Sequence, residues 1–188
     1  MSYELLKRLS LNEKKNKITL STDSNNVYPK DYRAWEFCNS NKEQYKNYTF
    51  DDKLKALMSC ILSGDLQVCA LNDSTTKILY ADNRMQKYMK LHNLDGYDMY
   101  CNREKYQKEY TDLFNIFKNS IFENDKGVYV LKVGNNDNYI TCKGKWKRGY
   151  ISGLYYGEGK ERAMKFNRQL AELIKDQYTS HEISIELA

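Results

Sequence analysis

The sequence has few proline, glycine and histidine residues and no long apolar segment. Its 188 residues include one proline, nine glycines and two histidines, and its mean hydropathy is −0.81. No run approaches the ~20 apolar residues that a membrane-spanning helix requires. Residues 1–11 are charged and lack the apolar stretch of a signal peptide. We therefore expect a cytoplasmic protein that does not enter a membrane.

Cysteine is present, but in no pattern that indicates a metal site or a disulfide framework. The five cysteines contain no C-x-x-C pair, and their number is odd. This usage is typical of reduced thiols in a reducing compartment. We expect no metal, no cofactor and no catalytic residues. The cysteines are Cys38, Cys60, Cys69, Cys101 and Cys142.

Positive charge, by contrast, is concentrated in one segment. Between Lys126 and Arg168, ten basic residues stand against three acidic ones, a local net charge of +7 in a chain whose total is +5. Such a patch creates a field that attracts polyanions. The chain also has 17 tyrosines, a residue that suits half-wet interfaces. Its richness in Asn, Lys, Tyr and Ile is typical of AT-rich genomes, which predicts an origin in a low-GC bacterium, a phage or a mobile element.

Hydrophobic periodicity predicts a mostly helical N-terminal part, residues 1–100, with a small β-hairpin. Residues 1–10 fit a short amphipathic helix, and Ile18 to Leu20 fit an edge strand. Thr49 and Asp52 have capping-box spacing, and a buried helix face follows them with Gly64 as its stop. The residues of that face are Leu54, Leu57, Met58, Ile61 and Leu62.

The next segment of this N-terminal part predicts two strands and a helix. Residues 66–70 and 77–80 fit a hairpin around a turn at Asn72, Asp73 and Ser74. A helix is expected from about residue 83 to 91.

The C-terminal part, residues 101–188, has the predicted order α-β-β-β-α, and the alternation over residues 181–187 fits a last strand. A helix over 103–122 has an apolar stripe that is typical of core packing. Strands at 128–133, 139–146 and 150–156 predict an antiparallel meander packed on a helix, and the fold class is therefore α+β. The apolar face of that last helix is Ala163, Phe166, Leu170, Leu173 and Ile174.

The middle strand of this meander carries the main functional signal. Cys142 falls on its inner, apolar face, whereas Lys143 and Lys145 fall on the outer face, with Lys147 and Arg148 beyond. Residues on one strand face lie about 7 Å apart, so this row can neutralise successive phosphates. Tyr139, Tyr150 and Tyr156 are near enough to stack on bases. The candidate nucleic-acid-binding residues are Lys143, Lys145, Lys147, Arg148, Tyr139, Tyr150, Lys160, Arg162 and Lys165.

Residues 128–175 resemble the three-stranded DNA-binding domain of phage integrases and ethylene-response factors. The resemblance rests on Gly144-Lys145-Trp146 in the middle strand and on Tyr155-Tyr156 leading to the segment from Arg162 to Asn167. It implies that the sheet lies in the major groove of DNA. Lys143, Lys145, Lys147 and Arg148 would then face the DNA.

A second resemblance is to the double-stranded RNA-binding domain. The helix at 103–122, the three strands, and Gly157-Glu158-Gly159-Lys160 opening a helix are similar to that domain. This resemblance implies that Lys160 and Arg162 grip phosphates across a groove. Both resemblances imply polyanion binding, and the choice between DNA and RNA stays open.

Three functional hypotheses follow. The first is a non-enzymatic nucleic-acid-binding protein that contacts DNA or RNA through the basic sheet face. The alternative is a phage or mobile-element inhibitor of a host defence complex, anti-CRISPR-like, that binds a protein or a ribonucleoprotein. The third is a small metal-dependent nuclease, suggested by the E-x-K triplet at Glu158 to Lys160. The oligomeric state is left open.

Overall fold

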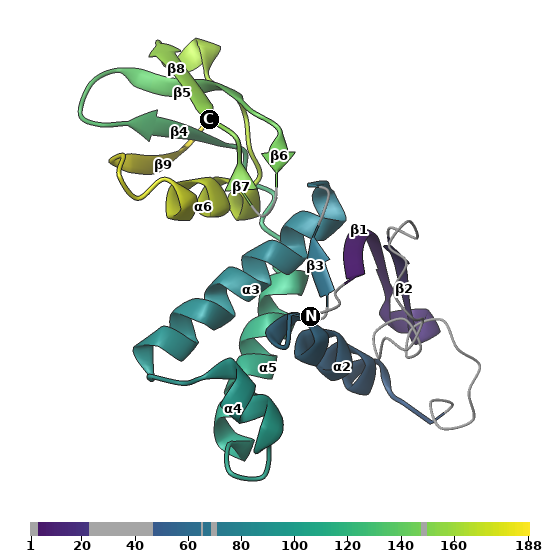
Figure 1. The fold of residues 1–188 in the computed structure, drawn as a ribbon. Helices are drawn as coiled ribbons and strands as arrows, with labels where there is room; N and C mark the ends of the chain where they lie inside the picture. The colour runs from purple at the N-terminus through teal and green to yellow at the C-terminus, as the bar shows by residue number, and fades with distance from the viewer. Residues whose placement is uncertain (1–3, 23–46, 65, 69–70, 148–149) are drawn as a thin grey trace. The chain divides into compact units, whose positions relative to one another are not determined.

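The computed structural model describes residues 4–22, 47–64, 66–68, 71–147 and 150–188 (Figure 1). It is a mixed α+β structure, as the sequence predicts. The chain divides into two compact units, residues 1–122 and 123–188. The boundary expected at residue 100 therefore does not coincide with this division, because the helix before residue 122 packs within the first unit.

The first unit combines a three-stranded sheet with four α-helices in the described residues. The strands are β1 (Glu4–Asn12), β2 (Lys17–Thr22) and β3 (Leu66–Val68), in the order β2-β1-β3. β1 pairs antiparallel with β2 and parallel with β3. The helices are α2 (Phe50–Leu62), α3 (Asp73–Leu91), α4 (Gly96–Cys101) and α5 (Gln107–Phe122).

The core of this unit is built from the helix faces that periodicity indicates. Leu54, Leu57 and Met58 of α2 are fully buried, and Leu113, Phe117 and Ile121 of α5 join them. The capping box of α2 is present, since Thr49 accepts from the Asp52 amide at 3.2 Å and Asp52 accepts from the Thr49 amide at 2.9 Å. Gly64 follows this helix with φ +76°, as a left-handed stop requires.

The helix expected over residues 1–10 is wrong for the described residues of this segment, since residues 4–12 form strand β1. Leu6 and Leu9 are both buried although they lie three residues apart, a spacing that a regular strand would place on opposite faces. The β1–β2 register shifts between Leu6 and Arg8. This irregularity lets Leu6 and Leu9 point to the same face of the strand. Their spacing of three residues, which is typical of a helix, therefore occurs in a strand.

The hairpin expected over residues 66–80 is also wrong. Asn72 does not sit in a hairpin turn but is the N-cap of α3, where its side chain accepts hydrogen bonds from the amides of Ser74 and Thr75. The polar cluster that suggested a turn is a helix start. Residues 77–80 are therefore helical, and β3 pairs with β1 instead.

The second unit is a four-stranded antiparallel sheet with one α-helix. Its strands are β4 (Tyr129–Val133), β5 (Asn138–Lys143), β8 (Leu154–Glu158) and β9 (Ile183–Leu187), in the order β8-β5-β4-β9. The helix is α6 (Arg168–Gln177), which packs against β4 and β9. By the register, Leu131, Ile183 and Ile185 share one face, and Lys132 and Ser184 share the other.

The helix expected to include Ala163 and Phe166 begins later than predicted. Residues 160–162 form a 3-10 turn, η3 (Lys160–Arg162), and α6 starts after the N-cap Asn167. Phe166 is instead extended and exchanges two backbone hydrogen bonds with Tyr129, at 2.8 and 2.9 Å. This pairing fixes residue 166 beside β4 and prevents a helix there.

Candidate nucleic-acid interface

The candidate site lies on the long segment that runs from β5 to β8, residues 138–158, which we call the interrupted hairpin. The two continuous strands predicted at 139–146 and 150–156 are wrong, because the first breaks at residues 144–145 and the second at residues 152–153. β6 (Trp146–Lys147) and β7 (Tyr150–Ile151) form a separate two-stranded ladder beyond β5 and β8 (Figure 1).

Two facing glycines account for the break. Gly153 has φ +131°, a conformation that side-chain-bearing residues rarely adopt. The Gly144 amide donates to the Gly153 carbonyl at 2.7 Å. A Cβ on Gly144 would lie 2.9 Å from the Ser152 carbonyl carbon, so this close approach also needs glycine. The sheet therefore ends at Lys143, and the predicted row of lysines does not run along one regular strand.

The outer part of the interrupted hairpin is attached to the end of α6. The Tyr178 hydroxyl donates to the Ile151 carbonyl at 2.5 Å and accepts from the Gly153 amide at 2.9 Å. The Ile151 amide donates to the Gln177 side chain at 3.2 Å. Ile151 itself is 1% exposed. These contacts hold the break in the hairpin at a defined position.

The predicted strand residues occupy different environments. Lys143 is half-buried at the end of β5, and Lys145 is exposed after Gly144. Lys147 ends β6 and pairs with Tyr150 of β7. Arg148 lies outside the described residues.

Tyr139 is not on an exposed face as the sequence predicted. It is 4% exposed, and its hydroxyl donates to Glu186 at 3.3 Å. Burial and the Glu186 carboxylate raise the pKa of the Tyr139 hydroxyl. Cys142, expected as a core residue on the inner face, is exposed. The β5–β8 register shifts between Ile140 and Cys142, and this bulge changes which side chains face inward.

The residues from η3 do not line a helix N-terminus. Lys160 forms an ion pair with Glu186 at 3.7 Å, and Arg162 forms one with Glu161 at 4.0 Å. Lys165 is exposed in the extended segment before α6. The predicted basic residues thus lie in two groups, one on the interrupted hairpin and one on η3 and the segment after it.

The charged residues of the interrupted hairpin are nearly all basic. Residues 138–157 contain four basic residues and no acidic one, whereas Asp137 and Glu158 flank the opposite end. Within the described part of the chain, Lys143, Lys145 and Lys165 form no ion pair or hydrogen bond through their side chains. Their charges are therefore available to an external anion.

Two exposed tyrosines lie on β8, the strand whose residue Leu154 pairs with Lys143. Tyr155 and Tyr156 of β8 are 66% and 56% exposed. Tyr156 was among the predicted stacking residues, but Tyr155 was not given this role. The signal that would have found both is a pair of consecutive tyrosines in one strand, since their side chains point to opposite faces of the sheet.

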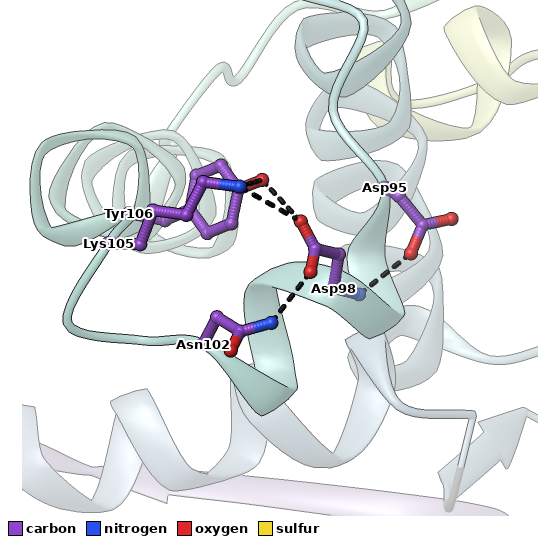
Figure 2. A network of polar contacts seen from close by, with 5 residues as sticks. All are labelled: Asp95, Asp98, Asn102, Lys105 and Tyr106. Carbon is purple, nitrogen blue, oxygen red and sulfur yellow. Dashed lines mark hydrogen bonds and ion pairs between the residues drawn. The ribbon is translucent and has the colours of Figure 1, made fainter.

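A separate polar network lies in the first unit (Figure 2). The Asp98 carboxylate accepts hydrogen bonds from Tyr106 and from the Asn102 amide group, the latter at 2.7 Å, and it pairs with Lys105 at 3.6 Å. The Asp98 amide donates to the Asp95 side chain, the N-cap of α4, at 2.7 Å. The hydrogen bonds from Tyr106 and Asn102 lower the pKa of Asp98. These contacts join α4 to the turn that precedes α5.

No family model matches the chain, and no curated protein or solved structure is significantly similar to it. In the described residues, no three His, Cys, Asp or Glu side chains come together in a way that would hold a metal ion. No helix in the same residues is long and apolar enough to cross a membrane.

Proposed function

We propose that the second unit binds nucleic acid non-enzymatically through the interrupted hairpin. The observation that carries the proposal is the set of lysines there that have no partner in the described structure. Lys143 and Lys145 lie on either side of Gly144 with no acidic residue between positions 138 and 157. Unpaired cations on one structural element are the electrostatic footprint of a phosphate-binding surface.

The attachment of the hairpin to α6 supports the proposal further. Tyr178 and Gln177 fix the backbone around Gly153. The lysines therefore project from an ordered framework, which lowers the entropy lost when they engage phosphates. Lys160 and Arg162, already paired with glutamates, are expected to contribute less than Lys143 and Lys145.

The test is fluorescence anisotropy with labelled single- and double-stranded DNA and RNA, at low and moderate salt. We expect binding that weakens steeply with salt, and we expect Lys143→Glu/Lys145→Glu to weaken it at least tenfold. The matched control is Lys14→Glu/Lys15→Glu, which changes the net charge equally at exposed residues of the first unit.

The outcomes are distinct. Loss of binding in the hairpin variant but not in the control supports the proposal. Equal loss in both would show that only net charge matters, and would contradict a site on the hairpin. Absence of binding to all four ligands would also contradict it and would favour the inhibitor hypothesis, in which the chain binds a protein.

A further inference from the structure

We infer that this surface is built for single-stranded nucleic acid, whose bases stack on Tyr155 and Tyr156 while Lys143 and Lys145 contact its phosphates. The inference rests on the proposed function and specifies its ligand. It begins from the way the chain uses its tyrosines.

Tyr155 and Tyr156 differ in their contacts from six other tyrosines of the described residues. Among the described residues, neither side chain makes a hydrogen bond or a ring contact. The hydroxyl groups of these six tyrosines form hydrogen bonds with a carboxylate, a serine or a backbone carbonyl. The tyrosines that bond in this way are Tyr88, Tyr106, Tyr110, Tyr129, Tyr139 and Tyr178. The two rings on β8 thus remain available to a ligand.

The register places a lysine beside one of these rings. Lys143 pairs with Leu154, two residues before Tyr156, so Lys143 and Tyr156 share a face of the hairpin as diagonal neighbours. Such neighbours lie about 7–8 Å apart, within the reach of long side chains. Tyr155 points to the other face, where it pairs with the exposed Cys142.

The edge position of β8 leaves both rings uncovered. β8 pairs only with β5 in the described sheet, and α6 packs on β4 and β9 instead. A nucleotide chain following this edge would meet an aromatic ring on either side and a lysine at one end. The arrangement combines the two components of single-strand binding, stacking platforms and a cationic track.

A duplex would use this surface poorly. Base faces inside a duplex are covered by neighbouring base pairs, so exposed rings cannot stack on them except at its ends. Reading a groove with a sheet requires a regular basic face, whereas this sheet stops at Lys143 and bulges after Ile140. The rings therefore favour unpaired bases over paired ones.

The experiment compares a single strand with a duplex of equal length, in both DNA and RNA. We expect wild type to bind the single strand more tightly. We expect Tyr155→Ala and Tyr156→Ala each to weaken single-strand binding about tenfold and to leave duplex binding nearly unchanged. Tyr155→Phe and Tyr156→Phe retain the ring and should bind as wild type does. Thermal melting of each variant confirms that the fold is kept.

Failure of this inference is distinguishable from failure of the proposed function. If the alanine variants bind single strands as wild type does while Lys143→Glu/Lys145→Glu does not, the stacking role is wrong and the phosphate-binding site stands. A duplex preference in wild type would also overturn the inference. If the lysine variant binds normally, the proposed function falls and the inference falls with it.

Discussion

Some tyrosines of this chain stabilise the fold through their hydroxyl groups, and two others are exposed on β8. In the first unit, Tyr88 of α3 donates to Asp112 of α5 at 2.9 Å and so joins two packed helices. In the second, Tyr129 donates to Asp125 at 2.6 Å and lies beneath the Arg168 guanidinium. These hydroxyls stabilise the fold, which explains part of the high tyrosine content. In the described structure, the side chains of Tyr155 and Tyr156 form no hydrogen bond, and we propose that they bind the ligand.

Asp98 gives a prediction about acid stability. Hydrogen bonds from Tyr106 and Asn102 hold the pKa of Asp98 below its ordinary value. A carboxyl whose pKa is lowered on folding adds stability above its unfolded pKa, about 3.9, and that stability is lost as the pH falls through the lower folded value. We expect Asp98→Asn to lower the free energy of unfolding at neutral pH. We also expect this free energy to fall less steeply in the variant than in wild type below about pH 4. Urea unfolding across this pH range measures both effects.

The control for that experiment is Asp73→Asn, an exposed carboxyl for which no hydrogen bond from another side chain is found in the described structure. It should lower the free energy of unfolding at neutral pH by less than Asp98→Asn does. Parallel curves for wild type and Asp98→Asn would contradict the assigned role of the network in Figure 2.

At the scale of elements, local signals predicted best the elements whose determinants lie within one short segment. The α2 helix is specified by adjacent residues, since its capping box and its buried face lie within one short segment. α3 was half missed because Asn72 caps a helix with the same residue types that make a turn. β1 was missed because its parallel partner, β3, is distant in sequence and because its irregular register with β2 imitates a helix.

The candidate site was predictable in composition but not in geometry. The sequence alone located Lys143 and Lys145 as a basic group. It did not show that the strand would stop between them, because Gly144 and Gly153 act as a pair that forms only when the two strands meet. Burial of Tyr139 likewise depends on Glu186, which arrives from β9.

The attachment of the interrupted hairpin to α6 can be tested with Tyr178→Phe. This change removes the hydroxyl that bonds the Ile151 carbonyl and the Gly153 amide, and leaves both without that partner. These two groups keep the hydrogen bond between them, at 2.9 Å, so we expect a loss of about 0.5–1.5 kcal/mol in the stability of the second unit. Amide hydrogen exchange at Gly153 should accelerate.

Tyr155→Phe is the matched control, since the Tyr155 hydroxyl makes no hydrogen bond in the described structure. It should leave both stability and exchange at Gly153 unchanged. Equal exchange rates at Gly153 in wild type and Tyr178→Phe would show that the hairpin holds its position without the Tyr178 hydroxyl.

At the scale of the whole molecule, the two units have separate cores. The core cluster that contains Leu6, Met58 and Phe117 draws all its members from residues 6–121. Buried residues of the second unit, such as Leu131, Ile140 and Ile174, lie outside that cluster. Each unit therefore buries its own apolar surface.

This division predicts that residues 123–188 fold when expressed alone. Their amide NMR spectrum should be dispersed and should overlay the corresponding signals of the full chain, because β4, β5, β8, β9 and α6 all lie within the fragment. A collapsed spectrum, restored only in the presence of residues 1–122, would show that the second unit depends on the first.

The salt dependence of single-strand binding is the most direct measurement of the central claim that Lys143 and Lys145 neutralise phosphates. Each phosphate contact contributes about 0.7 to the slope of log affinity against log salt concentration for a single strand. The full chain should therefore show a steep slope, and Lys143→Gln/Lys145→Gln should lower it by about 1.4. An unchanged slope in this variant would contradict the account, because the two lysines would then release no counterions on binding.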